Sequence, residues 1–202
     1  MTLRERQRQA REDAIIDAAH QLLIEQGYTD MNMDELAARL GASKATLYQH
    51  FPSKEELAVR VIVRMMQRGE ERMGGGDPGR PAIDRLEYAL RKGLEHRAGT
   101  WAARINLLPQ SIKQHPRYQA QRQCMIDKIA TLVEEAKREG DIAPGLETPV
   151  VTRLIMNLFR SDFDDLLENG AHTAEQINNT IVELILHGIR NPAPKPIQGE
   201  QE

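Results

Sequence analysis

The sequence predicts an all-α protein, because apolar residues recur at spacings of three and four and helix start and stop signals recur along its length. No segment shows the alternation of apolar and polar residues that marks a strand. We expect an N-terminal three-helix domain over residues 1–53, a connecting helix over residues 54–73 and a larger helical domain over residues 74–190. Residues 191–202 are rich in proline and polar side chains, so we expect a disordered tail.

Two helices are expected in the first forty residues. The first runs from Arg11 to Gln26 and stops at Gly27. Asn32 can cap the second helix, and Glu35, three residues later, can complete a capping box. The apolar residues that these helices turn inward are Ile15, Ala18, Ala19, Leu22 and Leu23 in the first, and Leu36, Ala37 and Leu40 in the second.

A tight turn should join the second helix to a third. Gly41 stands where a helix end favours a left-handed backbone, and Ser43 offers the next N-cap. Two helices that meet at so short a turn are typical of the helix-turn-helix, whose second helix enters the major groove of DNA. The residues from Lys44 to His50 would then form the reading helix.

The predicted third helix is polar on one side and anchored on the other. Leu47 and Phe51 lie four residues apart and can reach the core, and Pro52 ends the helix. Ser53 and Glu56 form a further capping box, so the connecting helix should begin at Lys54, where its amides and the lysine suit a phosphate oxygen. The same pattern also fits a three-helix core that never contacts DNA.

A family resemblance decides between these interpretations. The chain resembles the N-terminal domain of TetR-type bacterial transcriptional regulators from about Ala14 to Val63, and not beyond. That resemblance implies an all-helical homodimer that binds a palindromic operator and a C-terminal domain that often binds a small ligand. The matching positions are Leu36, Ala37, Gly41, Ala42, Ser43, Lys44, Thr46, Leu47, Tyr48, His50, Phe51, Ser53, Lys54 and Leu57.

The resemblance also implies which residues meet DNA. Ser43, Lys44 and Thr46 would contact the groove or phosphates, and Tyr48, His50 and Lys54 would contact the backbone. Such shared residues tend to position the protein rather than to select a sequence. Gln49 and Ala45 are better candidates for operator choice, since glutamine pairs with adenine and alanine can touch a thymine methyl.

The charges are unevenly distributed. The net charge is −3, which argues against a general nucleic-acid coat protein. Positive residues nevertheless gather around the motif, at Arg39, Lys44, Lys54, Arg60 and Arg64. They also gather in the first eleven residues, where Glu5 is the only acidic residue and the basic residues are Arg4, Arg6, Arg8 and Arg11. This segment either forms a disordered tail or contacts DNA as an arm.

The C-terminal part should contain five helices after a linker at residues 74–79, whose glycines lack the lysine and serine or threonine of a phosphate loop. Glycine and proline signals predict their bounds. Cys124 is expected among the apolar positions of the third of these helices, and Thr173 with Gln176 caps the last. The expected ranges are Pro81–Ala98, Trp101–Ile112, Pro116–Glu139, Thr148–Asn169 and Thr173–Gly188.

The last two helices carry apolar stripes that two chains could join into a four-helix bundle. The predicted interface residues are Leu154, Ile155, Leu158, Ile177, Ile181, Leu184, Ile185 and Gly188. The same stripes could instead only close the core of a monomer.

A pocket for a small, largely apolar effector is expected between the helices of this domain. A mostly apolar lining with a few polar groups is typical of ligand sites, although the same residues could fill a core. The candidate ligand-binding residues are Trp101, Arg104, Ile105, Leu108, Tyr118, Met125 and Phe159, with Asn106, Gln110 and Arg160 as further polar groups.

Other functions lack the necessary residues. A single cysteine, Cys124, rules out an internal disulfide, and neither a signal peptide nor a membrane-length apolar run is visible, so we expect a cytoplasmic protein without membrane contact. No catalytic motif, cofactor fingerprint or metal-ligand spacing is present, and the carboxylates at Asp162, Asp164 and Asp165 fit a solvated helix face better than a metal site.

Two hypotheses remain. The favoured one is a ligand-responsive repressor, with an activator as its close variant. The alternative is a helical small-molecule-binding protein or enzyme whose N-terminal three-helix unit is only structural.

Overall fold

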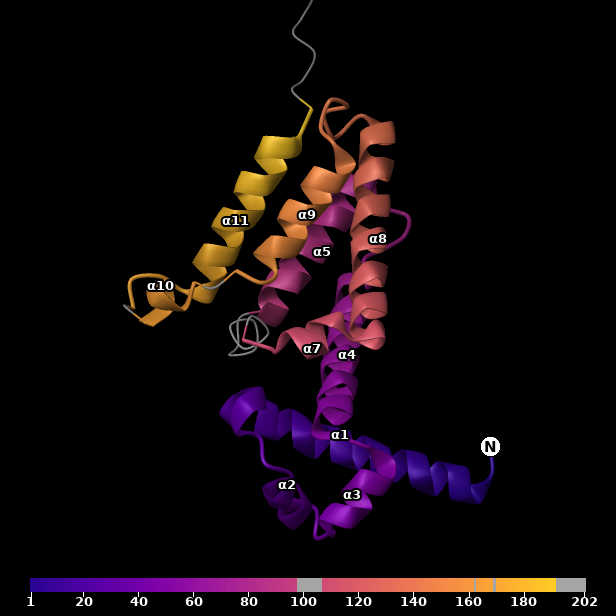
Figure 1. Ribbon diagram of the computed structural model, residues 1–202. Coiled ribbons are helices and arrows are strands. Elements are labelled where there is room, and N and C mark those ends of the chain that lie inside the picture. Colours follow the sequence, from indigo (N-terminus) through magenta and orange to yellow (C-terminus); the bar gives the residue numbers. More distant parts are fainter. Residues whose placement is uncertain (98–106, 162, 169, 192–202) are drawn as a thin grey trace, which may run out of the picture. The chain divides into compact units, whose positions relative to one another are not determined.

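The computed structural model describes residues 1–97, 107–161, 163–168 and 170–191, and within these ranges the chain is helical (Figure 1). The all-α prediction is therefore confirmed. The helices fall into two compact units: Met1–Glu71 with Arg97–Met125, and Arg72–His96 with Ile126–Glu202. Each unit therefore combines segments from distant parts of the sequence, and the predicted domains over 1–53 and 74–190 stay a prediction.

The first unit begins with α1 (Leu3–Asp30), which is longer than the sequence predicted. Thr2 and Glu5 form a capping box at its start, so the arginine-rich beginning of the chain is helical and not a disordered tail. Gly27 adopts a φ of 80° inside the range of α1, and this left-handed residue kinks the helix at the position where a stop was expected.

Three further helices pack with α1 around one apolar core: α2 (Met33–Arg39), α3 (Lys44–His50) and α4 (Lys54–Met73). Leu57, Val61 and Met65 of α4 are buried in this core. Leu108, Ile112 and Tyr118 join the same core from later in the chain. The other fully or nearly buried members are Ile15, Ile16, Ala19, Leu22, Leu23, Met31, Met33, Leu36, Ala37, Leu47, Phe51, Ala58, Val59 and Ile62.

The expected helix over Trp101–Ile112 is wrong at its end. The structure has a turn at Leu107 and Leu108 and a five-residue helix, α7 (Gln110–Gln114), for which Pro109 is the N-cap. A proline inside a helix removes a hydrogen bond and clashes with the preceding turn. Pro109 therefore lies at the start of α7 and not within a longer helix. Residues 98–106 lie outside the described part of the chain.

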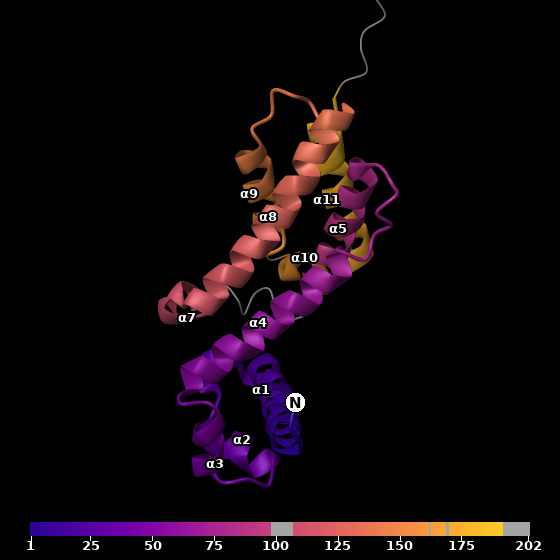
Figure 2. The ribbon, with the colours of Figure 1, turned by 90° about the vertical axis from the view of Figure 1, so that its right-hand side faces the viewer.

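The second unit is built from α5 (Ala82–Arg97), most of α8 (Pro116–Glu139), α9 (Thr148–Leu158), α10 (Asp164–Glu168) and α11 (Ala174–Ile189). Figures 1 and 2 show α5, α8, α9 and α11 side by side. Their shared core includes Leu86, Leu90, Leu94, Ile129, Val133, Ala136, Ile142, Val151, Ile155, Val182 and Leu186, each nearly or completely buried. The bounds of α8 and the capping box of Thr173 and Gln176 confirm the prediction.

Two local expectations in this part of the chain are wrong. The helix that begins at Thr148 ends at Leu158 and not near Asn169, because the following run of serine and aspartate has short polar side chains that favour turns. Glu147 occupies its N-cap position, and the Thr148 hydroxyl donates a hydrogen bond to Glu134. Cys124 is exposed, with its thiol directed at Glu70.

A close approach between α5 and the end of α9 depends on glycine. A Cβ atom placed on Gly93 would lie 2.6 Å from Cζ of Phe159. Real Cβ atoms do not approach a ring so closely, so any side chain at this position must push the ring away. The aromatic ring therefore packs against bare backbone.

We predict that Gly93→Ala lowers the free energy of unfolding by about 1–3 kcal/mol, because the added methyl overpacks the contact with Phe159. Urea unfolding of the single variants and of Gly93→Ala combined with Phe159→Leu measures this. The smaller side chain should recover part of the loss. Equal losses with and without Phe159→Leu would mean that the ring does not cause the strain.

Candidate nucleic-acid interface

The helix-turn-helix follows from local caps and one glycine. Asn32 caps α2 by accepting a hydrogen bond from the amide of Asp34, and Ser43 caps α3 by accepting one from Thr46. Gly41, between them, has a φ of 59°, as the sequence predicted. The reading helix has the predicted bounds, Lys44–His50. The capping box expected at Asn32 is absent, because the Glu35 side chain turns elsewhere.

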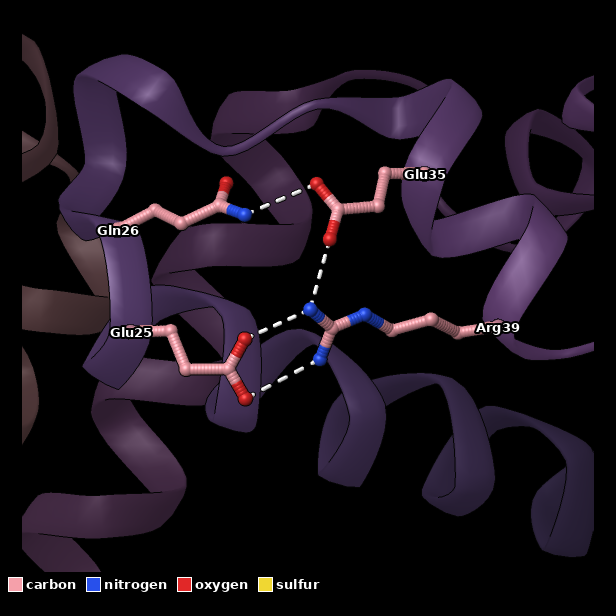
Figure 3. A network of polar contacts seen from close by, with 4 residues as sticks. All are labelled: Glu25, Gln26, Glu35 and Arg39. Carbon is pink, nitrogen blue, oxygen red and sulfur yellow. Dashed lines mark hydrogen bonds and ion pairs between the residues drawn. The ribbon is translucent and has the colours of Figure 1, made fainter.

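Glu35 instead joins a network that ties α2 to the end of α1 (Figure 3). The two terminal nitrogens of Arg39 bond to Glu25 at 3.2 and 2.6 Å, and Nη2 also lies 2.7 Å from Glu35. Gln26 donates to the other oxygen of Glu35 at 2.9 Å. A planar guanidinium suits two carboxylates at once, so this network fixes the angle at which α2 leaves the kink in α1.

These contacts shift the acidity of the carboxyl groups. The hydrogen bond from Arg39 holds the pKa of Glu25 below its ordinary value, and hydrogen bonds from Gln26 and Arg39 do the same to the pKa of Glu35. Arg39 is one of the cations that the sequence places near the motif. Its guanidinium is paired with the carboxylates of Glu25 and Glu35, so it positions α2 against α1.

The reading helix separates an inner face from an outer face. Leu47 and Phe51 are buried in the core of the first unit, as predicted. The side chains of Ser43, Lys44, Ala45, Tyr48 and Gln49 are exposed, and those of Thr46 and His50 are partly exposed. The predicted DNA-contacting residues of α3 therefore lie on the surface, and Lys54, at the start of α4, is partly exposed beside them in the chain.

Protein groups hold several of these side chains in place. Lys44 donates to Asp34 at 2.9 Å, and this hydrogen bond raises the pKa of Lys44. Lys54 donates to the carbonyl of Thr29 at 3.0 Å, and its ammonium lies 4.7 Å from the centre of the Tyr28 ring. Contacts of a solvent-accessible lysine are weakened by the surrounding water, so a phosphate can compete for either side chain.

His50 is linked to α1 through Glu12. Its Nδ1 lies 3.4 Å from Glu12 Oε1, which also accepts a hydrogen bond from Arg8 at 3.0 Å. Burial by itself raises the pKa of Glu12, but the hydrogen bonds from Arg8 and His50 outweigh it and leave that pKa below its ordinary value. The sequence gives no signal for the acidic partners of His50, Arg39 and Lys44, which are Glu12, Glu25 and Asp34.

The base of α4 is tied to the segment around α7. Glu55 accepts a hydrogen bond from Ser111 at 2.8 Å, and Glu56 pairs with His115 at 3.2 Å and Arg117 at 3.7 Å. Glu56 still receives its amide cap from Ser53, but its carboxylate does not complete the predicted capping box. These side chains attach the helix that follows the reading helix to α7 and the start of α8.

The predicted ligand-binding residues are found in different surroundings. Trp101, Arg104 and Ile105 lie outside the described residues. Leu108 and Tyr118 are buried in the core of the first unit. Met125 is the last residue of that unit and is partly buried. Phe159 packs against Gly93 in the second unit. The ligand site therefore stays a prediction.

An apolar groove of about 470 Å³ lies elsewhere, along α9, α10 and α11 of the second unit. Five of the predicted interface residues line it: Leu158, Ile177, Ile181, Leu184 and Ile185. Leu154 and Leu184 are 55% and 69% exposed, although they are large and apolar. Ile155 is fully buried within the unit, and Gly188 is exposed on α11.

Comparisons with known proteins agree with this geometry. Residues 15–61 match the family described as bacterial regulatory proteins, tetR family. The chain is 25% identical over 149 residues to the transcriptional regulator UidR of Escherichia coli K12, covering 71% of this chain and 75% of that protein. It is 23% identical over 190 residues to the transcriptional repressor KstR2 of Mycolicibacterium smegmatis, covering 89% and 91%.

A solved structure shows that the likeness of fold extends beyond the matched segment. A transcriptional regulator from Saccharomonospora viridis in complex with choline superposes with a TM-score of 0.74 at 18% identity, over 91% of this chain and 100% of that one. The exposed polar residues of the reading helix and the comparisons together identify a DNA-binding transcriptional regulator. The tetR-family match covers the N-terminal helices, and the relatives are transcriptional regulators, which decides against the alternative of an enzyme.

The described part of the chain contains neither a candidate membrane span nor a candidate metal cluster. None of the helices in the described part of the chain is both long and apolar enough to cross a membrane. Within the same residues, no three histidine, cysteine, aspartate or glutamate side chains are grouped to hold a metal ion, and Asp162 lies outside them.

We predict that Arg39→Gln weakens the pH dependence of stability on the acidic side. Because the pKa values of Glu25 and Glu35 are lowered in the folded protein, their contribution is present above the ordinary value of 4.5 and is lost as the pH falls through the lowered values. The thermal midpoints of wild type and variant should therefore differ near neutral pH and converge in acid.

Thermal unfolding between about pH 7 and about pH 3 measures this difference. Arg6→Gln is the matched control, since Arg6 is exposed and pairs with no carboxylate among the described residues. A difference between wild type and Arg39→Gln that stays constant across this range would contradict the assigned cause.

Proposed function

We propose that the chain is a cytoplasmic, ligand-responsive repressor that binds a palindromic operator as a homodimer. The observation that carries this proposal is the division of α3, whose Leu47 and Phe51 are locked in the core while Lys44, Tyr48 and Gln49 face outward. Such a helix can enter a major groove without disturbing the fold that presents it.

The outward residues take two different roles. Phosphate contacts are assigned to polar and basic residues within α3 and next to it in the chain: Ser43, Lys44, Thr46, Tyr48, His50 and Lys54. Ala45 and Gln49 are assigned to base edges, since both are exposed on α3 and neither is charged. Phosphate contacts would supply affinity and register, and the two uncharged residues would supply operator choice.

A second copy of this chain is the proposed partner along α9 and α11. Seven of the ten residues that line the groove are apolar. Leu184 in this lining and Leu154 on α9 are both largely exposed. Large apolar residues exposed on adjoining helices indicate a protein interface. Pairing α9 and α11 with their copies would form a four-helix bundle, and a palindromic operator would require the two reading helices of such a dimer to lie one turn of DNA, about 34–36 Å, apart.

The proposed effector is a small, largely apolar molecule that lowers operator affinity. The related Saccharomonospora viridis regulator holds choline, and TetR-type regulators usually respond to small molecules. The effector would favour a separation of the reading helices that the operator does not fit. A coupling of about 1–3 kcal/mol is sufficient, and DNA must then weaken effector binding by the same factor.

We predict that Lys44→Ala weakens operator binding and lowers the salt slope of the dimer, d log K/d log[salt], by about two units in magnitude, because each protomer loses one phosphate contact. Gel shifts on the DNA that flanks the chain's own coding region, at several salt concentrations, measure both quantities. Lys92→Ala is the control, because Lys92 pairs with Glu95 in the second unit. Unchanged affinity and slope for Lys44→Ala would refute the proposed role.

Replacing Leu184 by glutamate should shift the protein from dimer to monomer at micromolar concentration. Leu184 is 69% exposed within one chain, so the charge costs little in the monomer but would be buried in the dimer. Sedimentation velocity measures the change, with Leu107→Glu as control because Leu107 is 80% exposed and lies outside α9 and α11. An unaltered dimer in Leu184→Glu would place the interface elsewhere.

A further inference from the structure

The start of α1 projects beyond the body of the first unit. In Figure 1 its N-terminal end extends past α3, and every residue from Leu3 to Arg11 is exposed. This first part of α1 is exposed and buries little apolar surface, and the capping box supports it only locally. Some other role must account for its composition.

Three arginines of this segment share one face. Arg4, Arg8 and Arg11 are spaced at i, i+4 and i+7, which places them above one another on a helix. They span about 10 Å along the axis, at a rise of 1.5 Å per residue. Arg6 points the opposite way, since two residues turn the helix by about 200°.

The arginine face continues the buried stripe of the same helix. Ile15 and Leu22 lie eleven and eighteen residues after Arg4, which returns them to nearly the same angle at 3.6 residues per turn. That side of α1 is therefore the side that packs on the other helices of the first unit. The contact of His50 with Glu12, which also holds Arg8, places the end of α3 beside it.

Charge on this face is only partly balanced. Arg8 pairs with Glu12 at 3.0 Å. Arg4 and Arg11 make no ion pair with any residue that the structure describes. A row of cations, exposed and turned to the side of the reading helix, is complementary to a phosphate backbone.

We propose that Arg4, Arg8 and Arg11 form a second DNA-binding surface, which holds the phosphates that flank the groove occupied by α3. This rests on the proposed function, since it needs α3 on its operator. One strand carries a charge about every 3.4 Å along the axis, so a row of about 10 Å faces roughly three phosphates. The surface adds affinity and contributes no base readout.

Two duplexes and two matched variants test the proposal. One duplex holds the operator with its natural flanks, and the other ends at the outer edges of the half-sites. Arg4→Gln and Arg6→Gln remove the same charge from opposite faces, and glutamine preserves helix propensity. Circular dichroism checks that both variants keep the helical content of the wild type.

On the flanked duplex we expect Arg4→Gln to lower the salt slope of the dimer by about two units, one per protomer, and the double variant with Arg11→Gln by about four, whereas Arg6→Gln leaves it nearly unchanged. On the trimmed duplex the wild type should still bind, and all three variants should match it. Equal slopes for Arg4→Gln and Arg6→Gln on the flanked duplex would overturn the proposal. So would an equal loss on both duplexes, whereas failure of wild type to bind either would instead count against the proposed function.

Discussion

Burial of Leu47 and Phe51 is the constraint on which the reading helix depends. At seven residues, α3 is too short to be stable in water by its own hydrogen bonds. It persists because these two side chains join the core built by α1, α2 and α4. The turn at Gly41 and the N-cap at Ser43 then determine where α3 starts, so packing supplies the stability and these two residues supply the position.

The cations near the reading helix are held by acidic or carbonyl groups of the protein. Lys44 lies on Asp34, Lys54 on the Thr29 carbonyl, and Arg39 between Glu25 and Glu35. The first two pairs are weak and can yield to a phosphate, whereas the double pairing of Arg39 serves the angle between α1 and α2. In a protein with net charge −3, such pairing keeps non-specific attraction to nucleic acid low.

The parts that could be predicted from sequence are those that local chemistry decides. Gly41, Ser43 and Thr173 act within a few residues of themselves, and the structure places each as expected. Glu35 was misassigned because a distant arginine competes for its carboxylate better than its own N-cap does. Such a competitor becomes visible only when Glu25 and Arg39 are brought together by folding.

The helix that was expected to continue past Leu158 shows the same limit. Its apolar spacing persists through Phe159, but that ring packs on Gly93, sixty-six residues earlier, and the chain turns. Likewise, Leu108 and Tyr118 fit a pocket and a core equally well by composition. Their burial with the α4 residues is a property of the assembled unit.

The alternation of buried and exposed positions on α3 has an evolutionary consequence. Ala45 and Gln49 face solvent on either side of the buried Leu47, so substitutions at these two positions should change stability by no more than about 0.5 kcal/mol. Operator preference can therefore drift, or be engineered, without compensating changes in the core. A duplicated copy of such a chain could acquire a new set of target genes by replacing two surface side chains.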